Sequence, residues 1–178
     1  IMPLFKKAIY EDSVYPKNNL KELSRPVIAF HSYKGGVGRT LSLIAFAQAW
    51  TSIQDDPQKN KLLIIDSDLE APGLTLIQGN LNETAFSYLD LLTLIQDNNS
   101  IEEIVSTAEA LMGTLTLPIE TSQQRVEHFF LPTYRYEQQL FDLYASPQTI
   151  TISRNKEYIL AEVLSSLAAQ LGASAVLV

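Results

Sequence analysis

The sequence predicts an α/β fold with a mostly parallel sheet and helices on both faces. Three neighbouring segments carry this prediction: an apolar run over residues 27–32, an apolar stretch over 39–53, and a second apolar run over 62–66. Neither run alternates with polar residues, which is typical of strands covered on both faces. A strand, a helix and a strand in this order form a βαβ unit, whose two strands lie parallel.

The elements that follow extend this pattern. Residues 39–53 are apolar on almost every side, which predicts a helix buried on several sides. Two more helices are predicted over residues 86–96 and 100–111, and Ser100 and Glu103 form a capping box at the start of the second one.

The remaining segments complete the predicted sheet. Short apolar runs predict strands over residues 113–118 and 128–131. Apolar residues at four-residue spacing predict a helix over 153–171, with Gly172 as its C-terminal cap. Residues 173–178 then predict a third buried strand.

Composition excludes several classes of protein. The chain has 178 residues, is 46% hydrophobic and carries a net charge of -7, with no cysteine. This apolar content argues against a disordered chain, and the missing cysteines exclude disulfides, thiolate metal sites and thiol nucleophiles. The negative charge argues against direct nucleic-acid binding. Two histidines are too few for a histidine-only metal site.

The two ends of the sequence lead to expectations about domain organisation and location. Residues 1–24 are mixed and charged, and we expect a leader or arm ahead of a domain over 25–178. No secretory signal is seen, and the apolar stretch 159–178 fits a buried helix and strand better than a membrane span, so we expect a cytoplasmic protein without membrane contact.

Two single residues are given structural roles. His31 is expected to be a hydrogen-bonded core histidine, and Asp90 is expected to be a solvated side chain on its helix.

A glycine-rich turn joins the first predicted strand to its helix. It reads Tyr33-Lys34-Gly35-Gly36-Val37-Gly38-Arg39-Thr40. Glycines let the backbone approach a ligand closely, and N–H groups at the start of a helix favour an anion. The Thr40 hydroxyl is placed to bind Mg²⁺, and the cation of Arg39 can reach phosphate oxygens. Compared with the usual phosphate-binding pattern G-x-x-x-x-G-K-[ST], Tyr33 replaces the first glycine and Arg39 replaces the lysine.

This turn resembles the deviant P-loop of the ParA/MinD class of ATPases. The pattern of that class is K-G-G-x-G-K-[ST], and Lys34 takes the place of its additional lysine ahead of the glycines. Asp66-Ser67-Asp68 is similar to the D-x-D that follows the second strand in the class. Residues 66–73 also resemble a subgroup that pairs K-G-G-V-G-R-T with D-x-D-x-E-A-P-G, in which arginine at the lysine position is usual.

The resemblance implies a P-loop ATPase that binds ATP and Mg²⁺ at the carboxyl ends of its first two strands. It implies that the nucleotide is bound by Gly35, Gly36, Val37, Gly38, Arg39, Thr40 and Leu41. Thr40 and Asp66 would bind Mg²⁺. Lys34 and Asp68 are implied to be catalytic, Lys34 by reaching across an ATP-bridged homodimer and Asp68 by orienting the attacking water. The implied function is a nucleotide-dependent dimerisation switch in a larger protein.

The resemblance also implies further residues beyond this chain. Residues 175–178 resemble the strand that precedes the Walker B aspartate of the class, and its adenine-binding elements come still later. We therefore expect the chain to be the N-terminal part of a larger ATPase domain, with a sheet incomplete at its C-terminal side. Alone, it is expected to hydrolyse ATP poorly.

Other functions stay open. A non-catalytic nucleotide-binding or scaffold module would use the same loop without turnover, since the guanidinium of Arg39 differs from an ammonium in size and shape. An NAD-binding Rossmann-type domain would use Gly36 and Gly38 with an acid after the second strand, but Leu41 stands in place of its third glycine. The bacterial tyrosine kinases that share the deviant loop are a third class, although the tyrosine-rich tail expected of them is not seen.

Overall fold

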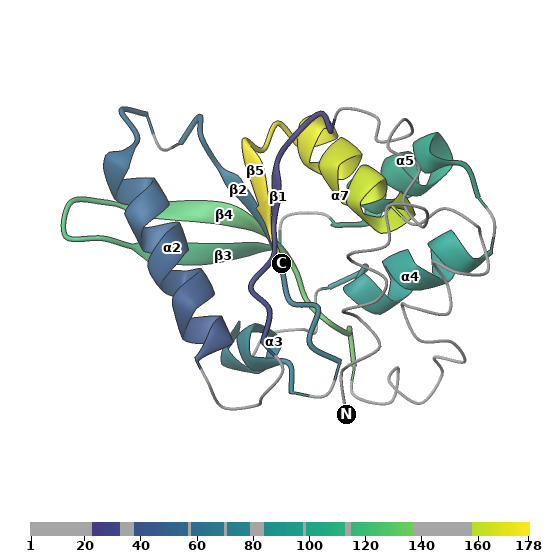
Figure 1. Ribbon diagram of the computed structural model, residues 1–178, viewed down its shortest axis with the longest axis horizontal. Helices are drawn as coiled ribbons and strands as arrows, with labels where there is room; N and C mark the ends of the chain where they lie inside the picture. The colour runs from purple at the N-terminus through teal and green to yellow at the C-terminus, as the bar shows by residue number, and fades with distance from the viewer. Residues whose placement is uncertain are drawn as a thin grey trace, which may run out of the picture.

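A five-stranded, mostly parallel sheet forms the centre of the computed structural model (Figure 1). The structure describes residues 23–32, 38–56, 58–69, 71–78, 84–97, 99–112, 115–136 and 158–178. The strands are β1 (Val27–Ile28), β2 (Leu62–Ile65), β3 (Thr116–Glu120), β4 (Arg125–Leu131) and β5 (Ala175–Leu177), in the order β1-β5-β2-β4-β3. All neighbours pair in parallel except β3, which runs antiparallel to β4 at the edge. The predicted α/β class is confirmed.

Helices cover both faces of this sheet, as the sequence predicts. One side carries α2 (Arg39–Ile53) and α3 (Gly73–Gln78), and the other carries α4 (Tyr88–Gln96), α5 (Ile101–Met112) and α7 (Ile159–Gln170) (Figure 1). The fully buried strand β2 contributes to two cores. Leu62 and Ile64 pack on the side of α2, whereas Leu63 and Ile65 pack on the side of α4, α5 and α7. Strand β2 therefore lies between two helical layers, which explains its unbroken apolar sequence.

Several local predictions are confirmed residue by residue. Helix α2 has the predicted bounds, and β5 is the predicted third buried strand, inserted between β1 and β2. Ser100 and Glu103 form the capping box: the Ser100 N–H donates to Glu103 Oε2 at 2.9 Å and the Glu103 N–H donates to Ser100 Oγ at 3.2 Å.

Gly172 ends α7 in the left-handed region, with a φ of 72°. The N–H groups of Gly172 and Ala173 donate to the carbonyls of Ala169 and Ala168 at 3.1 and 2.8 Å, the two bonds of a Schellman motif. The predicted cap is confirmed. The apolar stretch 159–178 is thus the short helix α7 followed by β5. Within the described part of the chain, no helix is both long and apolar enough to cross a membrane.

The predicted burial of α2 is wrong. Only Leu43, Ala47 and Thr51 are buried, while the side chains of Leu41 and Ile53 are 71% and 75% exposed. The helix lies on one face of the sheet, so four of its nine apolar residues are exposed. The sequence shows on which sides of a helix the apolar residues lie, but it does not show which of those sides other elements cover.

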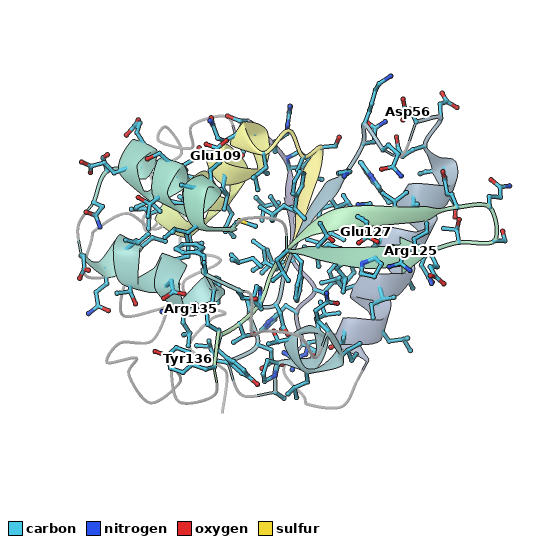
Figure 2. The ribbon with its side chains drawn as sticks, turned by 180° about the vertical axis from the view of Figure 1, so that it is seen from behind. Asp56, Glu109, Arg125, Glu127, Arg135 and Tyr136 are labelled. Atoms are coloured by element: carbon cyan, nitrogen blue, oxygen red, sulfur yellow. The ribbon has the colours of Figure 1, made fainter. Side chains whose placement is uncertain are left out.

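Other expectations also need correction. Strand β1 is shorter than predicted, and β4 begins three residues earlier than predicted. Strand β3 starts at Thr116 rather than at residue 113, because its strand residues are those that pair with β4, from Thr116 opposite Phe129 to Glu120 opposite Arg125. Asp90 is not merely solvated. It completes a capping box with Ser87 and accepts hydrogen bonds from Arg135 Nε and Nη2 at 2.9 and 3.0 Å, which links α4 to the segment after β4 (Figure 2). The arm expected before Arg25 and the helix start at Ser153 lie outside the described residues, apart from residues 23 and 24.

Candidate functional site

A cavity of about 460 Å³ lies at the carboxyl ends of β1, β2 and β5. Its size is within the range of small-molecule sites, roughly 300–1,000 Å³. Within the described part of the chain it is lined by Ala29, Phe30, His31, Arg39, Thr40, Leu43, Ile65, Asp66, Ser67, Asp68, Leu69, Leu74 and Val178. These residues come from three strand ends, from the first turns of α2 and from α3, so the parallel topology brings them to one edge of the sheet.

The start of α2 leaves its first N–H groups open to an anion. Gly38 precedes the helix with a φ of 84°, a conformation that favours glycine. Among the described residues no side chain caps the helix, and its first turn holds no acidic residue. The positive end of the helix dipole therefore acts together with the cation of Arg39 at the cavity.

Arg39 and Asp68 form an ion pair at the cavity. Arg39 Nη2 lies 2.8 Å from Asp68 Oδ2, with the two side chains 36% and 27% exposed. The other oxygen of Asp68 accepts a hydrogen bond from the Ala71 N–H at 3.1 Å. In the structure, Arg39, which is predicted to bind phosphate, is thus paired with Asp68, which is predicted to be catalytic.

Asp66 is buried directly after β2 and binds the start of α3. Its Oδ2 accepts hydrogen bonds from both the N–H and the hydroxyl of Thr75, each at 2.8 Å. Burial raises the pKa of Asp66, while the bonds from Thr75 oppose that rise. The Thr133 N–H donates to Thr75 Oγ1 at 2.9 Å, and the Thr133 hydroxyl donates to the Asp66 carbonyl at 2.8 Å. This network fixes α3 and the segment after β4 to the end of β2.

The candidate residues within the described part of the chain converge on this region. Arg39, Thr40, Asp66 and Asp68 all line the cavity. Gly38 and Leu41 flank Arg39 and Thr40 at the start of α2, but neither is among the described residues that line the cavity, and the side chain of Leu41 is exposed. Lys34, Gly35, Gly36 and Val37 lie outside the described residues, as does Glu70.

Sequence reasoning missed three contributors and misjudged a fourth. Thr75, Thr133 and Gly73 shape the surroundings of Asp66 and Thr40, and only their folded positions reveal this. His31 was expected in the core, but it is exposed and lines the cavity, because β1 ends at Ile28 and His31 lies beyond the carboxyl end of that strand, where the cavity is. The position of His31 just before the glycine-rich turn is the sequence feature that could have placed it at the site.

The site has the oxygen ligands that Mg²⁺ prefers. Among the described residues, no three His, Cys, Asp or Glu side chains form a group that could hold a metal ion. Magnesium, however, is commonly held by one or two carboxylates together with substrate phosphates and water. The hydroxyl of Thr40 and the carboxylates of Asp66 and Asp68 at one cavity fit that ligand set.

Comparison of the chain with protein-family models, with curated proteins and with solved structures found no match.

Proposed function

We propose that this chain binds ATP with Mg²⁺ and belongs to a ParA/MinD-like P-loop ATPase that hydrolyses it. One observation carries the proposal: Arg39, Thr40, Asp66 and Asp68 all line one cavity at the start of α2. This site suits a nucleoside triphosphate and its metal ion. The cation and the helix N-terminus can bind phosphate, and the hydroxyl and the two carboxylates can bind the metal ion.

Phosphate binding is assigned to the first turn of α2. The backbone N–H groups of this turn and the guanidinium of Arg39 hold phosphate oxygens through charge-assisted hydrogen bonds. Arg39 exchanges its contact with Asp68 for these oxygens. Because that ion pair is about one third exposed, it contributes only about 0.2–1 kcal/mol and does not prevent the exchange.

Metal binding and hydrolysis are assigned to Thr40, in the same turn of α2, and to Asp66 and Asp68, which follow β2. Thr40, through its hydroxyl, and Asp66 would hold Mg²⁺. An ion held there would supply positive charge against that of the phosphates. Asp68, once released by Arg39, orients the attacking water, and Lys34 is proposed to reach the phosphates of a second subunit.

The second candidate is a nucleotide-binding module without turnover. The contacts of both carboxylates favour it, because Asp68 is paired with Arg39 and Asp66 Oδ2 already accepts two bonds from Thr75. Such a module binds ATP and releases no phosphate. An NAD-binding domain is less well supported, since Arg39 and Thr40 have no assigned part in dinucleotide binding.

The wider proposal is a nucleotide-dependent switch in a larger cytoplasmic protein that dimerises when ATP is bound. The net charge of -7 supports a partner other than nucleic acid for this portion. No membrane contact is proposed.

Paired variants test the proposal by calorimetric ATP titration and by phosphate release. Thr40→Ala should abolish the effect of Mg²⁺ on ATP binding, whereas Ser52→Ala, which removes a hydroxyl at the far end of α2, should not. Arg39→Gln should weaken binding by roughly 10–100-fold, the loss of charged hydrogen bonds. The control is Arg125→Gln. Arg125 lies in the hairpin formed by β3 and β4, where its side chain pairs with Glu120 and Glu127 (Figure 2). ATP binding without phosphate release would select the second candidate, and equal binding by Arg39→Gln and wild type would refute the site.

A further inference from the structure

Gly73, the first residue of α3, lies against the side chain of Thr40 at the start of α2. A Cβ atom built on Gly73 would lie 2.9 Å from Thr40 Oγ1 and 3.4 Å from its Cγ2. Non-bonded heavy atoms are most stable at about 3.5–4.0 Å, so a methyl group at residue 73 would overlap the Thr40 hydroxyl.

The reason for glycine at this position is steric. Gly38 and Gly172 have positive φ angles of 84° and 72°, and a Cβ on either would meet no atom of the described residues within 4 Å. Those two glycines are favoured by their backbone conformation. Gly73, in contrast, is helical, so its backbone suits any L residue, and the close contact with Thr40 is what excludes a side chain.

The contacts around Gly73 and Thr40 indicate which of the two would move if residue 73 carried a methyl group. Helix α3 is held in place by Asp66, which accepts two bonds from Thr75, and by the buried side chain of Leu74. The hydroxyl of Thr40 ends a short side chain that can turn about one torsion angle, and helical threonine has two available rotamers. An added methyl group at residue 73 would therefore turn the Thr40 side chain rather than displace α3.

We propose that Gly73 is a positioning residue that keeps the Thr40 hydroxyl at the cavity, in the orientation that binds Mg²⁺. The inference rests on the proposed function, because it assigns Thr40 to the metal ion. It gives Gly73 a part in the nucleotide site although, among the described residues, Gly73 does not itself line the cavity.

A double-mutant cycle tests the inference. Gly73→Ala should weaken Mg²⁺-dependent ATP binding about tenfold or more, the loss of a ligand to a charged group. In a Thr40→Ala background no hydroxyl remains to be displaced, so Gly73→Ala should change the Kd less than about twofold. Gly172→Ala, at the end of α7, should leave the Kd unchanged in both backgrounds. Equal weakening by Gly73→Ala in both backgrounds would overturn the inference.

A measurement without nucleotide separates this inference from the proposed function. The NMR signal of the Thr40 methyl group should shift in Gly73→Ala and stay in place in Gly172→Ala. An unshifted signal would overturn the inference even if wild type binds ATP. No ATP binding by wild type would refute the proposed function, and with it this role of Gly73. If Gly73→Ala fails to fold, recovery of folding in the double variant with Thr40→Ala supports the overlap, and failure of both overturns it.

Discussion

Lowering the pH from 7 to 5 should destabilise this chain because the fold holds His128 in its neutral form. The ring is completely buried in β4. The Leu62 N–H donates to His128 Nδ1 at 3.1 Å, so the proton of the neutral ring lies on Nε2 and points to Thr51 Oγ1 at 2.9 Å. The Thr51 hydroxyl in turn donates to the Ala47 carbonyl at 2.8 Å. A second proton on Nδ1 would oppose the Leu62 N–H.

The size of this effect follows from the pKa of His128. Burial, and then the positive charge of Lys61, lower this pKa from 6.5 to about 4. Because the folded pKa is the lower one, the unfolded chain binds the proton first as the pH falls. Stability is therefore fully present above pH 6.5 and is lost down to about pH 4. The full loss is about 3 kcal/mol, of which about 2 kcal/mol should occur between pH 7 and pH 5.

Urea denaturation across this pH range checks the prediction. His128→Gln removes the titrating group and should remove most of the slope of the unfolding free energy against pH. Ser52→Ala is the control, because it removes an exposed hydroxyl on α2 and no titrating group, and it should leave the slope as in wild type. The same slope in wild type and His128→Gln would refute the assignment of the pH effect to this buried ring.

Three further predictions follow from the contacts around the site and in the cap of α5. Asp68→Asn releases Arg39 from an ion pair worth about 0.2–1 kcal/mol, so ATP should bind up to about fivefold more tightly in calorimetry while phosphate release slows. Asp66→Asn keeps an acceptor for Thr75 and removes a buried charge, so the free energy of unfolding in urea should not fall, whereas the effect of Mg²⁺ on ATP binding should decrease. Ser100→Ala removes a helix cap and should cost about 1 kcal/mol of unfolding free energy, with ATP affinity unchanged.

Local features of the fold could be predicted from the sequence because they depend on neighbouring residues. The capping box of Ser100 and Glu103, the left-handed cap at Gly172 and the bounds of α2 each arise within one or two turns of helix. Burial could not be predicted in the same way. Leu41 and Ile53 are as apolar as core residues but face outward, because the sheet covers only one side of their helix.

The two histidines show the same limit. An apolar run surrounds His31 in the sequence, yet His31 is exposed and His128 is buried, where α2 and β2 bring Thr51 and the Leu62 N–H against its ring. At the site, the motif gave Arg39, Thr40, Asp66 and Asp68 as candidates, and the fold places all four at one cavity. Their partners depend on tertiary packing that no local pattern contains.

The most direct test of the account is one calorimetric titration of the chain with ATP, with Mg²⁺ present and then with Mg²⁺ chelated. The account predicts saturable binding that weakens when the metal ion is removed, because Thr40 and Asp66 would hold it beside the phosphates. NAD titrated in parallel should not bind. Binding of NAD instead of ATP, or ATP binding that is indifferent to Mg²⁺, would contradict the central claim.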